Sequence, residues 1–298
     1  MAEITAALVK ELRERTGSGM MECKRALQET GGNIEGAVEL MRKAGQAKAD
    51  KKASRVAAEG LIAIRQAAGA AAMVEINCET DFVTKNDDFR AFVDAVADAA
   101  LTGESSDFAA FLASPMANGQ SVEQGRRDCI AKIGENINVR RFARLASAEG
   151  VLGCYLHGTR IGVLVELEGG DADLAKDIAM HVAASRPLCI GEDQVPADLI
   201  AKEKEIYAAQ AEDEAKGKPA HIVEKIIGKI VEGKLRKYLE SVTLLGQAFV
   251  KDPDRTVGEL LAAREAKVVR FERFELGEGI EKRADNFAAE VMAQVRGD

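Results

Sequence analysis

The side chains that could do chemistry are concentrated in one short segment, Cys78 to Asp87. It offers a thiol at Cys78, a carboxylate at Asp81 and a large aromatic ring at Phe82, within a polar, turn-forming run. A loop carboxylate beside an aromatic ring could accept hydrogen bonds from a surface into which the ring docks, or compete for its charges. The alternative is that Phe82 folds back onto its own core, as loop aromatics often do.

The rest of the chain carries no recognisable catalytic or nucleotide-binding motif. The three histidines, His157, His181 and His221, fall in different expected elements, and no nucleophile motif or H-E-x-x-H zinc signature occurs. The phosphate-cradling G-x-x-x-x-G-K-[ST] sequence is missing, and Gly277 to Gly279 matches only half of a dinucleotide fingerprint. We therefore expect no metal, no cofactor and no bond chemistry.

Composition narrows the class of protein. The chain has 298 residues, 47% of them hydrophobic, which is enough for two or three domains with buried cores. Its net charge of -8 argues against a nucleic-acid binder, which needs basic residues to neutralise phosphates. Aromatic residues make up only 4%, with no tryptophan, so few side chains could stack on bases. We expect a protein partner.

Nothing in the sequence indicates secretion or membrane insertion. No apolar run approaches the roughly 20 residues of a membrane span, and residues 1–5 lack the layout of a signal peptide. We expect a cytoplasmic protein whose cysteines are reduced and fill space in apolar cores, because their spacing fits neither a disulfide framework nor a zinc site. The five cysteines are Cys23, Cys78, Cys129, Cys154 and Cys189.

Residues 4–45 predict a unit of three helices. Apolar residues recur at helical spacing, Gly17 to Gly19 breaks the first helix from the second, and Asn33 is a good cap for the third. Thr5 or Thr16 can cap the first helix.

The second helix begins with Met20 and Met21, which could belong to the core or to an adaptable contact surface. Residues 46–54 are rich in Ala, Lys and Asp without an apolar stripe, which predicts a solvated helix or a linker. A domain boundary near residue 55 follows.

The middle of the chain is duplicated. Residues 58–100 predict a strand, a turn, a second strand and a helix, and residues 148–185 repeat this order. The second copy passes from strand to helix through the short turn Glu168 to Asp171, whereas the first copy has the longer Cys78 to Asp87 segment. We expect residues 80–87 to be a surface loop, and a loop elaborated in one copy favours a function for it.

The remaining sequence predicts further elements. Residues 122–134 predict a helix, the segment after Gly134 up to Phe142 predicts a strand, and residues 267–276 alternate as an edge strand. Two helices within residues 199–241 predict an antiparallel hairpin, either a solvated surface feature or a dimerisation or docking arm. A last amphipathic helix carries Phe287, Val291 and Val295.

Together these landmarks resemble the bacterial elongation factor Ts family over nearly the whole chain. The most specific segments are Leu12 to Lys24, Cys78 to Val83, Ile133 to Ile137 and His157 to Val163. The resemblance implies an α+β fold with an N-terminal three-helix, ubiquitin-associated-like domain, two related α+β core subdomains, a helical hairpin linked to dimer contacts, and a C-terminal helix. Departures lie mainly in residues 102–120, to which no role is carried over.

The expected domain boundaries follow these landmarks. Residues 1–54 are the N-terminal helical domain, and residues 55–145 are the core N-subdomain. Residues 146–276 are the core C-subdomain, with its hairpin at about 199–241, and residues 277–298 are the C-terminal helical module.

The resemblance also implies a function. The implied protein is a guanine nucleotide exchange factor, not an enzyme. It would bind GDP-bound elongation factor Tu, displace Mg2+ and promote GDP release during translation elongation. In the family the Thr-Asp-Phe-Val loop reaches the GTPase near its magnesium and phosphates. That role carries over to Thr80, Asp81, Phe82 and Val83.

Other contact residues are implied in the same way. The helical domain of the family touches the GTPase domain, which places Arg13, Met20 and Met21 at the interface. His157 is similar to a family contact residue that works beside the loop, although it could also be an exposed turn histidine. The resemblance leaves a homodimer and a 2:2 complex open.

Two rival functions start from parts of the sequence. The three-helix start alone would suit an adaptor for ubiquitin-like proteins, which would lose all binding on deletion of residues 1–54, whereas an exchange factor would keep part of it. A small enzyme could use Cys78 with His157, and alkylation of Cys78 without loss of function would exclude it.

Overall fold

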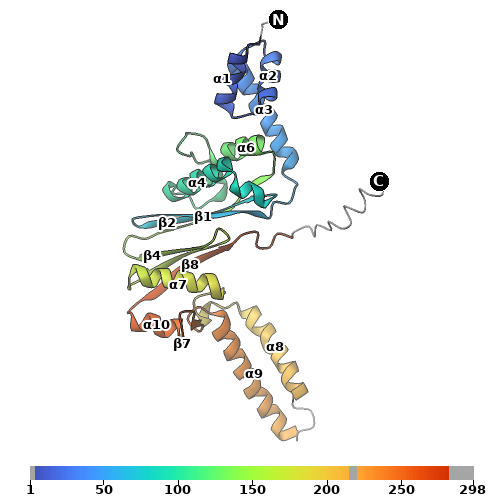
Figure 1. Ribbon diagram of the computed structural model, residues 1–298. Coiled ribbons are helices and arrows are strands. Elements are labelled where there is room, and N and C mark those ends of the chain that lie inside the picture. Colours follow the sequence, from blue (N-terminus) through green and yellow to red (C-terminus); the bar gives the residue numbers. More distant parts are fainter. Residues whose placement is uncertain (1–3, 215–219, 282–298) are drawn as a thin grey trace, which may run out of the picture. The chain divides into compact units, whose positions relative to one another are not determined.

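Two three-stranded sheets, each with helices packed on it, organise the chain (Figure 1). The computed structural model describes residues 4–214 and 220–281. The chain divides into two compact units. The first comprises residues up to Arg65, Met73–Ala143 and residues from Glu275, and the second comprises Gln66–Ala72 and Arg144–Phe274. This mixture of helices and sheets confirms the α+β class, while the four-part division in the sequence stays a prediction.

The first unit begins with the three predicted helices, α1 (Ala6–Thr16), α2 (Met20–Glu29) and α3 (Ile34–Lys52). They close around a small apolar core that their spacing predicted, because one stripe of each helix faces the other two. The buried members of this core are Val9, Leu12, Cys23, Ala26, Leu27 and Ala37.

The caps of α1 and α3 follow the sequence prediction except at Thr16, and α3 is longer than predicted. Thr5 caps α1 and Asn33 caps α3, each accepting a backbone N–H, but Thr16 is the last residue of α1 and its hydroxyl donates to Leu12 instead. The segment expected as a solvated helix or linker continues α3 to Lys52. It is not fully solvated, because Ala49 is buried where α3 packs on a later helix.

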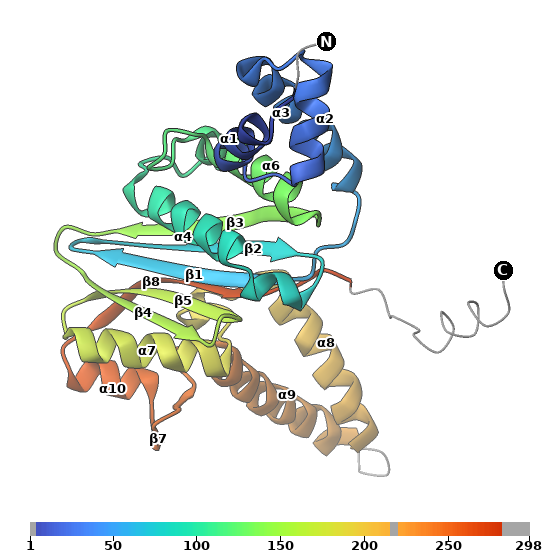
Figure 2. The same cartoon turned by 45° about the horizontal axis from the view of Figure 1, so that its top comes forward.

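The sheet of the first unit has the order β1-β2-β3. Strands β1 (Glu59–Ala67) and β2 (Ala70–Cys78) form a hairpin, and β3 (Ile137–Ala146) pairs with β2. Helices α4 (Asp87–Thr102) and α6 (Val122–Ile133) cover one face of this sheet (Figures 1 and 2). The central strand is buried along almost its whole length, as expected for the middle of a covered sheet.

Between these helices lies an element that the sequence did not predict. Helix α5 (Phe108–Ala113) falls in the residues for which no role was expected. It is held by aromatic packing, since the ring of Phe111 stacks on Phe142 of β3 at a centroid distance of 4.2 Å.

A buried carboxylate lies at the centre of the first sheet. Glu75 of β2 is 0% exposed and accepts hydrogen bonds from Arg140 Nη1 (2.9 Å), Arg141 Nε (2.6 Å) and the backbone N–H of Gly277 (2.8 Å). Burial opposes ionisation of Glu75, but these donors outweigh it, so its pKa is lowered. The ionised Glu75 therefore joins β2, β3 and the segment after the last strand.

The second unit repeats the strand, strand, helix order, as the duplication predicted. Strands β4 (Val151–His157) and β5 (Ile161–Glu168) pair antiparallel, and β8 (Lys267–Glu275) completes the order β4-β5-β8 at the edge. Helix α7 (Ala172–Ser185) packs on β4 and β5 (Figure 2). Helix α10 (Val257–Ala263), which the sequence did not predict, contributes Val257, Leu260 and Leu261 to the same core.

Close packing in this unit depends on a glycine. A Cβ atom at Gly153 of β4 would lie 2.3 Å from the carbonyl oxygen of Ala175 in α7, so only glycine permits this approach of strand and helix. The strand glutamate also recurs. Glu166 of β5 is 8% exposed and accepts a hydrogen bond from Arg270 Nε of β8 at 2.6 Å, as Glu75 does from β3.

The predicted hairpin is present as α8 (Ala197–Glu214) and α9 (Ala220–Val242), which pack antiparallel along their length (Figure 1). A two-stranded sheet of β6 (Ala248–Phe249) and β7 (Asp252–Thr256), not predicted, follows it. The expected C-terminal helix with Phe287, Val291 and Val295 lies outside the described residues.

A buried histidine joins α7 to this small sheet. His181 is 0% exposed, and both ring nitrogens are used: Nε2 lies 3.0 Å from Gln247 Oε1, and Nδ1 accepts the N–H of Val250 (3.2 Å). These contacts require the neutral ring with its proton on Nε2. Burial lowers the pKa of His181, and the Gln247 bond only partly offsets this.

Removing the charge of Glu75 should destabilise the fold. We expect Glu75→Gln to lower the free energy of unfolding by about 2 kcal/mol, because two arginines lose their buried counter-charge. Glu166→Gln should cost less than about 1 kcal/mol, since Arg270 is 47% exposed and hydrated. Urea unfolding followed by circular dichroism measures both, with the exposed Glu104→Gln as control. A Glu75→Gln curve that overlays the control would contradict this account.

Acid should weaken the fold through His181. The unfolded chain takes up a proton as the pH falls through about 6.5, whereas the folded chain, with its lowered pKa, does not. The stability that neutral His181 contributes is therefore fully present above about pH 6.5 and is lost progressively as the pH falls below it. Melting temperatures between pH 8 and pH 5 should fall more steeply for the unmodified chain than for His181→Asn, which is less stable throughout. Equal slopes in the two proteins would refute the assignment.

Candidate functional site

The segment expected to be a loop after β2 is more ordered than predicted. It folds as a 3-10 helix, η1 (Asp81–Lys85), which corrects the expectation of an irregular loop. The Thr84 hydroxyl donates to the Asp81 carbonyl at 2.6 Å and closes this turn. Asn86 then accepts the N–H of Phe89 and begins α4. Side-chain capping thus turns a polar run into a short rigid element.

Two neighbours in η1 face opposite environments. The Phe82 side chain is 76% exposed, whereas Val83 is 6% exposed. The alternative in which Phe82 folds back onto its own core is therefore wrong. Val83 is the apolar anchor of η1, and the geometry holds Phe82 outward beside it, which exposes an apolar ring to water on a rigid support.

The residues beside Phe82 differ in how they are held. Thr80 is bound twice by Glu135, which accepts its backbone N–H at 3.0 Å and its hydroxyl at 2.7 Å. The Asp81 carboxylate is exposed, and among residues 4–214 and 220–281 no hydrogen bond or ion pair holds it. Asp81 and Phe82 are thus presented to solvent, while Thr80 and Val83 fix them in place.

Sequence reasoning missed the residues that hold this turn. Glu79 accepts the backbone N–H of Asn136 at 2.6 Å and pairs with Arg55 at 3.4 Å, while the Asn136 side chain donates to the Arg55 carbonyl at 2.7 Å. Glu135 and Asn136 stand in a segment that was specific to the resemblance but had been given no role. The available signal was a carboxylate and an amide directly after the glycine that ends α6, a position suited to caps and turns.

Cys78 cannot serve as a nucleophile in its present environment. Its thiol is buried and donates to the Thr80 carbonyl at 3.1 Å. Burial, with the nearby Glu135 carboxylate, raises the pKa of Cys78 to about 12, so the thiolate is essentially absent near neutral pH. The His157 ring is hydrogen-bonded to Tyr155 within its own strand. The structure therefore opposes the rival reading of a Cys78–His157 enzyme.

The second predicted contact group lies at the α1–α2 turn. Met20 and Met21 are 55% and 76% exposed in the first turn of α2, and Arg13 is exposed in the last turn of α1. The interpretation of the methionine pair as core is wrong. Two flexible apolar side chains beside a cation suit a contact surface.

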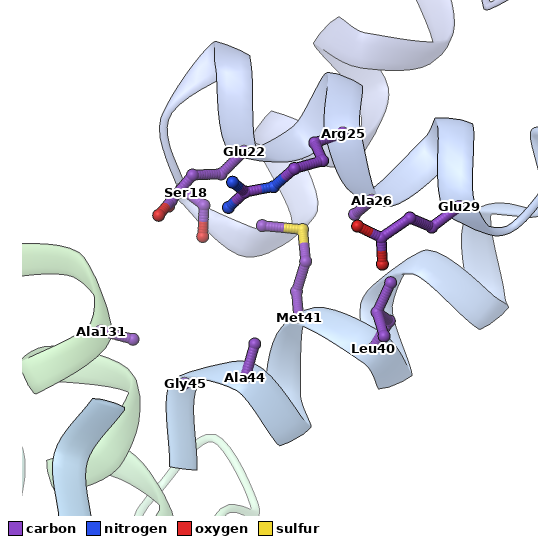
Figure 3. Close-up of a pocket in the computed structure, with 10 residues that line it drawn as sticks. All are labelled: Ser18, Glu22, Arg25, Ala26, Glu29, Leu40, Met41, Ala44, Gly45 and Ala131. Carbon is purple, nitrogen blue, oxygen red and sulfur yellow. The ribbon is translucent and has the colours of Figure 1, made fainter. Parts of the chain in front are cut away.

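A groove of about 270 Å3 lies between α2 and α3 (Figure 3). Met41 of α3 points into it, opposite the charged side chains Glu22, Arg25 and Glu29 of α2 (Figure 3). Its volume is below the usual range for small-molecule sites. We assign no cofactor to it.

His157, the remaining predicted contact, ends β4 at the turn into β5, as expected. Its side chain is exposed, and Nδ1 lies 3.1 Å from the hydroxyl of Tyr155. Its ring is thus oriented by its own strand.

The described part of the chain has neither a metal-binding cluster nor a membrane-spanning helix. Residues 4–214 and 220–281 hold no group of three or more His, Cys, Asp or Glu side chains that could bind a metal ion. None of the described helices combines the length and apolar character that crossing a membrane requires.

Known proteins are similar to this chain along almost its full length. The sequence profile described as Elongation factor TS matches residues 79–278. Elongation factor Ts of Methylococcus capsulatus is 65% identical over 295 residues, which cover 98% of this chain and 99% of that protein. Elongation factor Ts of Thioalkalivibrio sulfidiphilus is 61% identical and that of Legionella pneumophila strain Paris is 54% identical. These alignments cover 99% of this chain, and 99% and 100% of the relatives, respectively.

The buried thiols should resist alkylation. Burial raises the pKa of both Cys78 and Cys129 to about 12, so iodoacetamide at pH 8 should leave these two cysteines unmodified in the native chain and label them after urea unfolding. Peptide mass spectrometry measures this directly, with the urea-unfolded sample as the matched control. Labelling of native Cys78 at the rate of a free thiol would revive the enzyme alternative.

Proposed function

The chain belongs to the elongation factor Ts family, and on that premise we propose that it is a guanine nucleotide exchange factor for elongation factor Tu. It binds the GDP-bound GTPase, displaces Mg2+ and promotes GDP release during translation elongation. It performs no bond chemistry itself and acts in the cytoplasm. The chain is a translation elongation factor by family, and exchange is the activity that its site supports best.

The observation that carries the proposal is the presentation of Phe82. A phenylalanine that is 76% exposed on a turn held by capping and by Glu135 carries apolar surface that its own chain leaves uncovered. Such an aromatic ring is a typical anchor in protein interfaces, where it enters a pocket of the partner. We propose that Phe82 inserts between helices of the GTPase.

The free-energy balance shows that Phe82 needs help. Exchange couples two binding equilibria, so whatever weakens GDP binding equally weakens binding of the factor when GDP returns. A thousandfold loss of GDP affinity corresponds to about 4 kcal/mol, whereas burial of one phenylalanine supplies roughly 1.5–3 kcal/mol. Other contacts must therefore contribute.

Asp81 is the nearest of these contributors. Its carboxylate is exposed and has no hydrogen-bond or ion-pair partner in the described chain, so it can act on groups of the partner without first breaking a bond of its own. We propose that it perturbs the surroundings of Mg2+, so that the metal and then the phosphates lose ligands.

The remaining predicted contacts extend the interface. Arg13, Met20 and Met21 are exposed at one end of the helical domain and are proposed to contact the GTPase domain. His157 is exposed at the β4–β5 turn and is proposed as a further contact. The α8–α9 hairpin, on which Ile206 is 40% exposed, is proposed as a dimerisation or docking arm, in a homodimer or a 2:2 complex.

Loss of the loop side chains should slow exchange without unfolding the protein. Release of fluorescent GDP from elongation factor Tu, followed by stopped flow, should be strongly accelerated by the unmodified chain. Phe82→Ala should lower kcat/KM roughly 10- to 100-fold, because the buried area of one ring is lost. Asp81→Ala should also slow GDP release. Lowering free Mg2+ should reduce the difference in release rate between this variant and the unmodified chain.

Phe108→Ala is the matched control, since Phe108 is another partly exposed phenylalanine, at 37%, and lies outside the turn. It should release GDP at the unmodified rate. Unchanged release by both Phe82→Ala and Asp81→Ala would remove the turn from the mechanism, and no acceleration by the unmodified chain would refute the function itself.

A further inference from the structure

We propose that Glu135 is the positioning residue of Thr80 and η1, which together we call the exchange turn. By holding Thr80, Glu135 fixes the direction in which Asp81 and Phe82 leave the core. This inference rests on the proposed function and adds a residue that acts through Thr80. The observation behind it is a set of reciprocal hydrogen bonds between Glu79-Thr80 and Glu135-Asn136, which we call the carboxylate clasp.

The clasp is reciprocal in its geometry. Glu135 accepts the backbone N–H of Thr80 (3.0 Å), and Glu79 accepts the backbone N–H of Asn136 (2.6 Å). In each segment the glutamate accepts a backbone N–H from the other segment. The donor is in each case the residue that directly follows the other glutamate. The Thr80 hydroxyl adds a third bond, to the second Glu135 oxygen, at 2.7 Å. Hydrogen bonds to ionised groups are the stronger class, so the two segments are joined firmly.

The Glu135 side of the clasp is itself immobilised. Gly134 ends α6 in the left-handed region with φ 89°, and its carbonyl accepts a hydrogen bond from the Lys52 ammonium. Asn136 is 5% exposed, and its side chain donates to the Arg55 carbonyl. The turn that carries Glu135 is therefore anchored on both sides, and it can transmit that rigidity to Thr80.

Thr80 is where this rigidity matters. It is the last extended residue before η1, with φ -124° and ψ 153°, and its side chain makes no capping bond to η1. Glu135 alone among the residues of the described chain accepts both the N–H and the hydroxyl of Thr80. Without it, η1 would keep its Val83 anchor but lose its fixed entry point. An exposed ring that is already oriented loses less conformational entropy when it binds.

Two substitutions separate the hydrogen bonds of Glu135 from its negative charge. Glu135→Ala removes both acceptors. Glu135→Gln keeps one carbonyl oxygen for the Thr80 N–H, and its amide N–H can donate to the Thr80 hydroxyl, which then acts as acceptor. The glutamine variant should therefore rescue most of what alanine loses. Glu104→Gln, at an exposed glutamate in the same unit, is the matched surface control.

The first test observes the turn in the free protein and needs no partner. The chain contains no tryptophan, so Phe82→Trp introduces a single fluorescent reporter at the position in question. Adding Glu135→Ala should lower the fluorescence anisotropy of this indole, whereas adding Glu135→Gln or Glu104→Gln should leave it unchanged. Equal anisotropy in all four proteins, with equal melting temperatures, would overturn the positioning role.

The second test is a double-mutant cycle in the GDP-release assay. Glu135→Ala should lower kcat/KM about tenfold when Phe82 is present, the size expected for loss of a charged hydrogen bond. It should change kcat/KM less than about twofold when Phe82 is already alanine, because there is no ring left to position. Equal effects in both backgrounds would show a general structural role and overturn the proposal.

The outcomes also separate this inference from the proposed function. If the unmodified chain fails to accelerate GDP release, the exchange function falls, while the anisotropy still decides whether Glu135 orients the turn. If Phe82→Ala is defective and Glu135→Ala is not, only the positioning role falls. If Glu135→Ala melts at a much lower temperature, Thr80→Val replaces it in both tests. This variant removes only the hydrogen bond from the Thr80 hydroxyl to Glu135.

Discussion

The buried carboxylate of Glu75 is the constraint on which the first unit depends. A charge with no exposure is tolerated only if donors surround it, and here they come from β3 and from the backbone of Gly277. The requirement fixes the register of β2 against β3 and brings the chain's last described segment to the sheet. Because β2 ends three residues later at Cys78, the same constraint sets where the segment leading to η1 begins.

The duplication shows what was elaborated on this scaffold. Glu166 and Arg270 repeat the strand glutamate and its arginine in the second unit, so both copies share one way of joining their strands. The copies differ at the exit from the second strand. After β5 the chain passes through a short turn into α7, whereas after β2 it forms η1 with Phe82 outward. The scaffold is common to both copies, and the exposed ring belongs to one.

Local sequence patterns predicted most of the fold. For the site they predicted where it lies in the sequence but not how its side chains are presented. Helical spacing and glycine breaks predicted α1 to α3, and α7 was predicted with its observed bounds. The presentation of Phe82 could not be predicted, because it depends on the contact of Thr80 with Glu135, 55 residues away. Periodicity carries no information about such pairs. Helix α10 and the strands β6 and β7 were missed because they are too short to show a period.

The distribution of the chain between the two units has a consequence for biosynthesis. Gly277 lies 202 residues after Glu75, and the residues from Glu275 belong to the first unit although the second unit precedes them in sequence. While the ribosome is still translating the second unit, the carboxylate of the first lacks one of its donors. Nascent chains must therefore wait, incompletely folded, until almost the entire message has been read. Early termination would leave Glu75 with its two arginines but without the Gly277 N–H, and the less stable first unit would be a natural target for degradation.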